Sequence, residues 1–235
     1  LQVRCWIQEQ LPLYWGTQPF TSGPTYAGAI IMFLFIFGLL FVKSEMRVWI
    51  LLATIMSIML AWGKNFMPLT DLFLDYFPGY NKFRAVSMIL VIAEFTIPLL
   101  GFVALNKFLT TEAPYNEKKK PLKLAFYIVG GLTLVFALMP NLFFDFVGGQ
   151  DDMLAKRGWP VDALQADRAG LLSSDAWRSF IFIALTFGAM WMFLKNKLSS
   201  KYAILIVGVL VLADMWTINK RYLNDDNFAR KSKNL

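Results

Sequence analysis

Six apolar runs of near-membrane length recur along the 235-residue chain, and they constrain the fold more than any other feature. A helix needs about 20 mostly apolar residues to cross the hydrocarbon core of a bilayer. These runs are apolar all round rather than on one face, which favours lipid as their surroundings. We therefore predict an all-α, polytopic bundle of about six transmembrane helices, with interfacial helices in the outer loops, over residues 24–42, 48–62, 85–105, 124–139, 177–194 and 202–218.

The alternative is a large soluble helical core, and the composition argues against it. The chain is 57% hydrophobic and 17% charged, whereas soluble domains have about 25% charged residues. The charges also cluster between the apolar runs, as expected for segments that flank a membrane. The net charge of +7 therefore indicates membrane flanks rather than nucleic acid as the partner.

Three short connections between the runs are basic, and short basic loops face the cytoplasm. We therefore place these connections in the cytoplasm and residues 1–23, 63–84, 140–176 and the C-terminal tail outside. The basic residues are Lys43 and Arg47, then Lys107, Lys118, Lys119, Lys120 and Lys123, and finally Lys195, Lys197 and Lys201.

The composition also limits the chemistry and suggests how the chain is organised. There is no histidine and one cysteine, Cys5, which excludes histidine bases, histidine metal sites and an intrachain disulfide. No cofactor is predicted, and nothing in the sequence supports a divalent cation. Because Leu1 opens the chain without a signal-peptide pattern, we expect a fragment of a larger protein. Residues 1–219 would form the transmembrane domain, and 220–235 the start of a truncated extracytoplasmic soluble region.

Glu94 is an acid inside the third apolar run, about 15 Å along the helix from Arg84 at about 1.5 Å per residue. A charge near mid-bilayer costs at least about 2.5 kcal/mol, so we expect Glu94 to be buried in the bundle. It would serve either as a relay or substrate contact, or as a structural hydrogen bond beside the bend at Pro98.

Lys82 and Arg84 stand at the outer end of the same run. The planar guanidinium of arginine and the point charge of lysine both suit phosphate, although each also suits an interfacial anchor that reaches the headgroups. Pro24 opens another helix on the same side, and helix N-termini attract anions. Trp15, in the aromatic stretch before it, could contact a lipid phosphate or a sugar ring.

The remaining acids are interpreted as structural. Asp71 and Asp75 are four residues apart and share one face of a short interfacial helix, which we interpret as its wet face. Asp151 and the acids that follow it up to Asp175 are interpreted as solvated helix caps. Asp214, near the end of the last run, is expected to make an interfacial or interhelical polar contact.

Four stretches resemble the bacterial YfhO family of membrane proteins, and together with the helix pattern they cover nearly the whole chain. They are YWGTQPFTSGPTYAGA at 14–29, AWGKNFMPLTDLFLDYFPGYNKFRAVSMILVIAEF at 61–95, QADRAGLLSSDAWRS at 165–179 and DMWTINKRYLNDDNF at 214–228. The resemblance implies a glycosyltransferase of the GT-C class in the bacterial inner membrane. Such an enzyme moves a sugar from a polyprenyl-phosphate carrier to a cell-envelope acceptor on the outer face.

The resemblance further implies that Arg84, helped by Lys82, holds the carrier phosphate. The outward cavity would be lined by Trp15, Tyr80, Lys82 and Arg84. The catalytic acid is expected in an earlier outer loop, so none is assigned in this chain. Two other functions stay open, namely a non-catalytic envelope assembly protein and a transporter or lipid flippase. A flippase would need polar residues on several helices at one depth, and Glu94 is the only central acid, which counts against this function.

Overall fold

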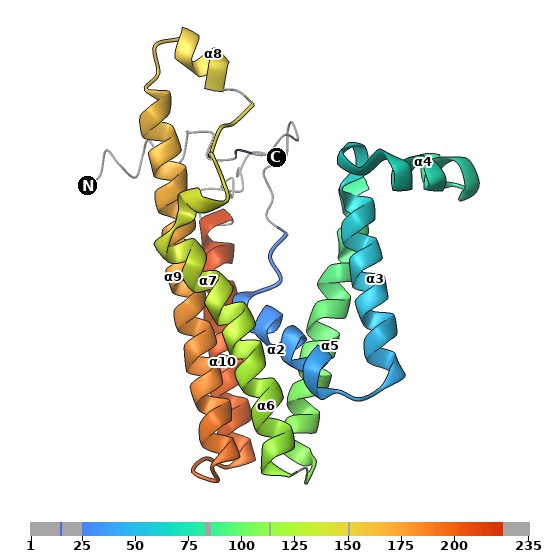
Figure 1. The fold of residues 1–235 in the computed structure, drawn as a ribbon, viewed down its shortest axis with the longest axis vertical. Helices are drawn as coiled ribbons and strands as arrows, with labels where there is room; N and C mark the ends of the chain where they lie inside the picture. Colours follow the sequence, from blue (N-terminus) through green and yellow to red (C-terminus); the bar gives the residue numbers. More distant parts are fainter. Residues whose placement is uncertain (1–14, 16–24, 83–85, 113, 150, 223–235) are drawn as a thin grey trace, which may run out of the picture. The chain divides into compact units, whose positions relative to one another are not determined.

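The described part of the chain is all-α, as predicted, with no strand (Figure 1). The computed structural model describes residues 15, 25–82, 86–112, 114–149 and 151–222. The α-helices are α2 (Ala29–Phe41), α3 (Glu45–Ala61), α4 (Met67–Tyr76), α5 (Leu90–Thr110), α6 (Tyr115–Ala125), α7 (Gly131–Leu138), α8 (Asp151–Lys156), α9 (Val161–Leu194) and α10 (Ser200–Tyr222). Short 3-10 turns lie at η1 (Gly63–Phe66), η2 (Tyr80–Lys82), η3 (Val86–Ile89) and η5 (Pro140–Leu142), and the π-turn η4 (Phe126–Gly130) joins α6 to α7.

Several of these helices are long and apolar enough to cross a membrane, which supports a multi-pass membrane protein. Within the described residues, four candidates pass on length and composition: Ser87–Thr110, Tyr115–Leu138, Val161–Leu194 and Ser200–Arg221. A fifth arises only if Glu45–Ala61 and Gly63–Tyr76, which meet at a bend of 110°, count as one broken span. The structure therefore supports four or five spans in place of the predicted six.

The first apolar run accounts for part of this difference. The predicted helix over 24–42 is shortened to α2, which has 13 residues and is about 20 Å long against a hydrocarbon core of about 30 Å. It begins at Ala29 because Gly28 has φ +93°, a left-handed conformation that a helix cannot continue through. This run is therefore too short to span the bilayer as one straight helix.

The chain divides into two compact units, and α2 forms the centre of the larger one, residues 25–130 and 182–235. α2 packs against α5, α6 and α10, while α3 packs against α5. Ile30, Phe33, Leu34 and Phe37 of α2 are fully buried. The α3–α5 contact includes a hydrogen bond between the buried hydroxyls of Thr54 and Thr96 at 2.7 Å. α2 is thus a core helix, enclosed by its neighbours.

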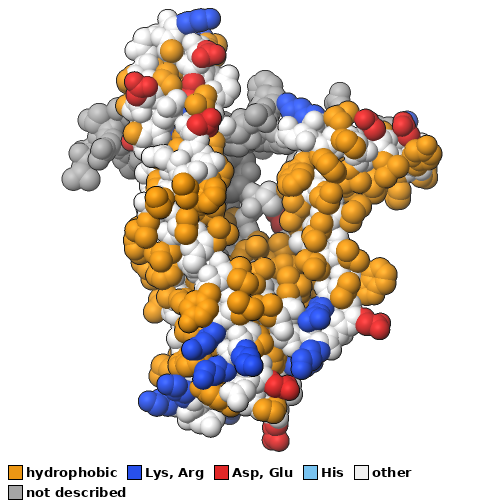
Figure 2. All heavy atoms as spheres, viewed as in Figure 1, with side chains coloured by type: hydrophobic (Ala, Val, Ile, Leu, Met, Phe, Trp, Pro, Cys, Tyr) orange, Lys and Arg blue, Asp and Glu red, His pale blue; other side chains and the backbone are white. Residues whose placement is uncertain are grey.

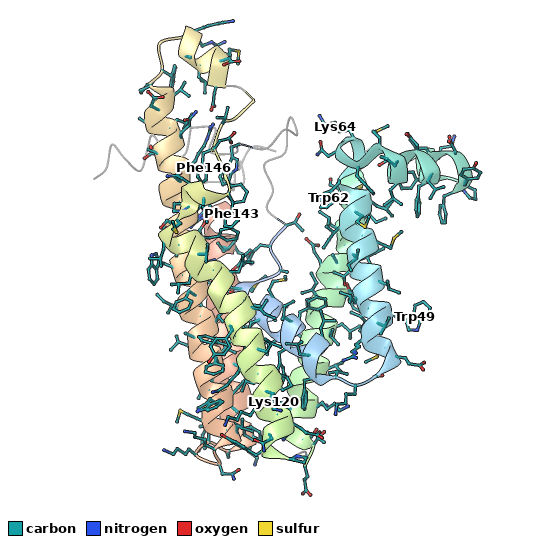
Figure 3. All side chains as sticks on the ribbon, viewed as in Figure 1. Trp49, Trp62, Lys64, Lys120, Phe143 and Phe146 are labelled. Carbon is teal, nitrogen blue, oxygen red and sulfur yellow. The ribbon has the colours of Figure 1, made fainter. Side chains whose placement is uncertain are left out.

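The three basic connections lie together at one end of this unit, as predicted for loops on a common side of the membrane. Lys43 after α2 is 3.8 Å from Glu117 in α6. Lys123 of α6 and Lys195 after α9 both lie over the ring of Trp191. Figure 2 shows the Lys and Arg side chains gathered at this end, and Figure 3 shows Lys120 there. We call this the basic end of the unit.

Two helices extend beyond the apolar runs that predicted them. α6 begins at Tyr115, directly after Pro114 and well before the apolar run at 124–139, and places Glu117 in its first turn. Proline before the first turn and an acid within it both favour a helix start. α9 begins at Val161, so Asp175 lies inside this helix and its interpretation as a helix cap is wrong.

The smaller unit comprises residues 1–24 and 131–181. Its described part contains α7, η5, α8 and the first half of α9. The Ser173 hydroxyl of α9 donates to the carbonyl of Ala137 in α7 at 2.6 Å. The loop between α7 and α8 buries Phe146, while Phe143 is exposed; both are labelled in Figure 3.

A close helix crossing in the larger unit generates a stability prediction. A Cβ atom added to Gly38 of α2 would lie 2.9 Å from Leu100 Cγ and 3.1 Å from the Leu100 carbonyl of α5. We expect Gly38→Ala to lower the free energy of unfolding by about 1–3 kcal/mol, because overpacking forces the two helices apart. Gly208→Ala is the matched control, since Gly208 of α10 has open space around its Cβ position. SDS-driven unfolding of both variants measures the effect, and equal stability of the two would contradict the crossing.

Candidate functional site

The end of the larger unit opposite the basic loops carries the turn on which two of the predicted site residues lie. α3 runs from the basic end to Ala61, and α5 returns to it from Leu90, so residues 62–89 join the two helices at the opposite end. The chain turns at Gly63, which has φ +50°, and Figure 3 shows Trp62 and Lys64 at this corner. The Thr70 hydroxyl of α4 donates to the Gly63 carbonyl at 2.9 Å and fixes the corner.

Tyr80 begins the short turn η2 and leans on the aromatic side of α4. The centroids of the Phe73 and Tyr80 rings are 5.6 Å apart, and Phe73 stacks on Phe77 at the same distance. The Tyr80 hydroxyl is shielded from solvent and has no hydrogen-bond partner among the described residues. A buried hydroxyl without a partner costs about 1–3 kcal/mol. A ligand that accepts a hydrogen bond from the Tyr80 hydroxyl would recover that free energy.

Lys82 ends the same turn, and its side chain is exposed. The ion pairs formed within the described residues, Lys43–Glu117 and Asp151–Arg168, do not include it. Arg84, the predicted phosphate ligand, lies outside the described residues. Asp71 and Asp75 are both exposed on α4, as are Leu72 and Leu74 between them, so their interpretation as its wet face stays a prediction.

Trp15, the fourth predicted residue, is described in the smaller unit. Its ring makes an edge-to-face contact with Phe146, with the centroids 5.2 Å apart. Tyr80 and Lys82 therefore share one turn, whereas Trp15 packs on an aromatic residue of its own unit.

Glu94 differs from its prediction, because its side chain is exposed rather than buried. α5 turns Ala93, Ile97 and Leu100 toward the bundle, and residue 94 points about 100° away from residue 93 at 3.6 residues per turn. The neighbouring Phe95 is exposed as well. Pro98 lies inside α5, and the helix continues through it to Thr110.

Asp214 of α10 is a buried acid that makes the interhelical contact expected of it. Its Oδ1 accepts a hydrogen bond from the Tyr26 hydroxyl at 2.9 Å, and its Oδ2 accepts one from the backbone N–H of Ala29 at 2.8 Å. Ala29 is the first residue of α2, and Gly28 before it offers no side chain to cap the helix. Asp214 therefore supplies the N-cap from another helix.

A buried ion pair in the smaller unit was missed by the sequence analysis. Asp151 was interpreted as a solvated cap, but it is buried and bound by both guanidinium NH groups of Arg168, at 2.8 and 2.9 Å. Arg168 also donates to the Phe146 carbonyl at 2.7 Å, and the Gly148 N–H donates to Asp151 at 2.8 Å. The stretch 151–175 holds Lys156 and Arg157 as well as Arg168, and the sequence gives no way to choose which of them pairs with Asp151.

The described residues offer no site for a metal ion, and the chain has no match among known proteins. Within the described residues, no three His, Cys, Asp or Glu side chains gather closely enough to hold a metal ion. The chain matches no family model, and no curated protein or solved structure is significantly similar to it. The resemblance to the YfhO family therefore stays a prediction.

The cap on α2 leads to a graded prediction. Asp214→Ala removes the carboxylate that accepts from both the Ala29 N–H and the Tyr26 hydroxyl, whereas Tyr26→Phe leaves the Ala29 N–H with its shorter bond, the one to Asp214 Oδ2. We expect losses of about 2–3 kcal/mol for Asp214→Ala and about 1 kcal/mol for Tyr26→Phe in the free energy of unfolding. SDS-driven unfolding in micelles gives both values. Wild-type stability of Asp214→Ala would show that the cap contributes nothing.

The Asp151–Arg168 pair predicts a dependence of stability on pH. The hydrogen bonds from Arg168, which outweigh the opposing effect of burial, hold the pKa of Asp151 below its usual range, and the Gly148 N–H adds to this. The carboxylate then stabilises the fold above its unfolded-state pKa of about 3.9, and the stabilisation is lost as the pH falls through the lower native pKa.

Melting temperatures of the wild type and Asp151→Asn between pH 2.5 and 7 test this dependence. The gap between the two should be widest above about pH 5 and should narrow toward pH 2.5. A gap that is constant with pH would contradict an ionised pair.

Proposed function

We propose that this protein is an integral membrane glycosyltransferase of the GT-C type. It moves a sugar from a polyprenyl-phosphate carrier to a cell-envelope acceptor at the outer face of the bacterial cytoplasmic membrane. The observation that carries the proposal is the η2 turn, where the buried Tyr80 hydroxyl, which has no hydrogen-bond partner among the described residues, lies two residues before the exposed Lys82. Arg84 follows two residues later in the sequence.

The position of this turn fits an outer-face site. The basic loops meet at the other end of the same unit, and short basic loops face the cytoplasm. The turn then belongs to the outer surface, at the start of α5 and beside the aromatic side of α4. A carrier whose lipid tail lies in the bilayer would present its phosphate at this level.

The three side chains suit a phosphate that gains charge during the reaction. In the transfer, an acceptor hydroxyl oxygen bonds to the anomeric carbon, and the bond from that carbon to the phosphate oxygen breaks. The electron pair stays on the polyprenyl phosphate, which leaves with an additional negative charge. Lys82 and Arg84 would stabilise that charge, and the Tyr80 hydroxyl would donate a hydrogen bond to it. No described carboxylate is assigned as the base that accepts the hydroxyl proton.

A transfer assay with matched variants tests the proposal. The full-length protein in liposomes is given polyprenyl-phosphate carriers bearing radiolabelled sugars, together with an envelope glycan acceptor. We expect Arg84→Ala and Lys82→Ala to reduce transfer by about 10–100-fold each, and Tyr80→Phe by about 5–10-fold, because each removes one contact to the phosphate. Lys64→Ala is the control, since Lys64 is also an exposed lysine on this side of the unit.

Each alternative function has its own outcome in this assay. Normal transfer by Arg84→Ala and Lys82→Ala would make both residues anchors to the membrane surface. A wild-type protein that is inert with every carrier, but still binds envelope glycan, would be an assembly protein. Movement of the labelled carrier across the bilayer without transfer of the sugar would identify a flippase.

A further inference from the structure

The seam between α6 and α9 at the basic end brings two unpaired lysines onto one tryptophan. The ammonium nitrogen of Lys123 is 5.4 Å from the centroid of the Trp191 ring, and that of Lys195 is 5.5 Å from it. The two ammonium groups therefore lie within roughly one Debye length of each other, which is about 10 Å at 0.1 M salt. Within the described residues, neither lysine takes part in an ion pair.

The tryptophan is fixed by an aromatic stack that runs deeper into the unit. Trp191 stacks on Phe187 with the centroids 5.6 Å apart, and Phe187 stacks on Phe126 at 4.3 Å. This stack joins α9 to η4 at the end of α6 and fixes the ring that both lysines contact. The two like charges are thereby held to one rigid ring, and an anion bound by both would reduce their repulsion.

The neighbouring lysines show that this pairing is specific to the seam. Lys118 is buried and donates to the Phe108 carbonyl at 2.7 Å, so it serves as a cap for the end of α5. Lys197 and Lys201 are exposed, and neither lies over an aromatic ring in the described structure. Lys123 and Lys195 are the pair held on one rigid ring.

The surface next to the lysines is apolar and suits a lipid chain. Leu124, directly after Lys123, is exposed, and so are Tyr127 and Ile128 about one turn further along, in η4. On α9, Met192 is exposed beside Trp191. A ligand here would therefore meet positive charge at its head and an apolar helix face below it, which is the arrangement that anionic phospholipids require.

We propose that the Lys123–Trp191–Lys195 seam binds the headgroup of an anionic phospholipid of the leaflet at the basic end. The headgroup phosphate contacts both ammonium groups, and an acyl chain lies along the exposed face of α6 and η4. This inference is independent of the proposed sugar transfer, because the two sites lie at opposite ends of the unit.

Native mass spectrometry of the purified full chain with added phosphatidylglycerol or phosphatidylcholine tests the proposal. We expect phosphatidylglycerol to bind the wild type at least about tenfold more tightly than phosphatidylcholine. Lys123→Gln with Lys195→Gln should weaken phosphatidylglycerol binding by about 10–30-fold. Lys197→Gln with Lys201→Gln removes the same charge from the same end and should change it less than about threefold.

Two further arms separate the remaining explanations. Glycerol phosphate, which carries the headgroup chemistry without tails, should not displace the lipid at millimolar concentration; displacement would indicate a site for a free phosphate ester and overturn the lipid assignment. Equal losses of phosphatidylglycerol binding in the two double variants would show that the lipid responds to diffuse surface charge and not to the seam. If the first double variant fails to fold, Lys195→Gln alone should weaken binding about threefold to fivefold, and unchanged binding would also overturn the proposal.

Discussion

The larger unit depends on a helix that starts inside it rather than at its surface. In a bilayer, backbone N–H groups have no water to bind, so each must find a partner within the protein. α2 is preceded by Gly28, which has no capping side chain, and its first N–H is satisfied by Asp214 of α10. This contact joins α10 to the start of α2, while α5 and α6 pack against the buried apolar side chains along the helix.

The two ends of this unit use polar side chains in different ways. At the basic end, lysines lie over aromatic rings or cap a helix, as Lys118 does for α5. At the other end, the corner is fixed by the Thr70 hydroxyl on the Gly63 carbonyl, and the next turn leaves the Tyr80 hydroxyl without a partner among the described residues. This contrast supports the proposed phosphate site at the η2 turn.

The sequence predicted the features that depend on local composition. Apolar runs identified the helices, and the basic residues between them identified the loops that meet at one end. The exposure of Glu94 could not be read in this way, because an all-round apolar helix does not reveal which face meets its neighbours. The early starts of α6 and α9 follow Pro114 and Pro160, and a search for apolar runs passes over such polar first turns.

The contacts that define the candidate sites depend instead on pairings between distant residues. Asp151 pairs with Arg168, and Asp214 accepts a hydrogen bond from Tyr26. No periodicity in the sequence links these positions. The Tyr80 hydroxyl has no partner in the described part of the chain, which only a three-dimensional structure reveals. The sequence therefore predicted the fold class and the basic side, while the site geometry required the fold itself.

The cap on α2 also has a consequence for the order of assembly. The Ala29 N–H and the Asp214 carboxylate that accepts from it are 185 residues apart, and a ribosome adds about 5–20 residues per second. α2 is therefore synthesised long before its cap exists, and it is too short to span the bilayer while it waits. Until α10 is made, the N-terminus of α2 lacks the Asp214 cap. A chaperone or the insertion machinery therefore has a defined interval in which to bind α2.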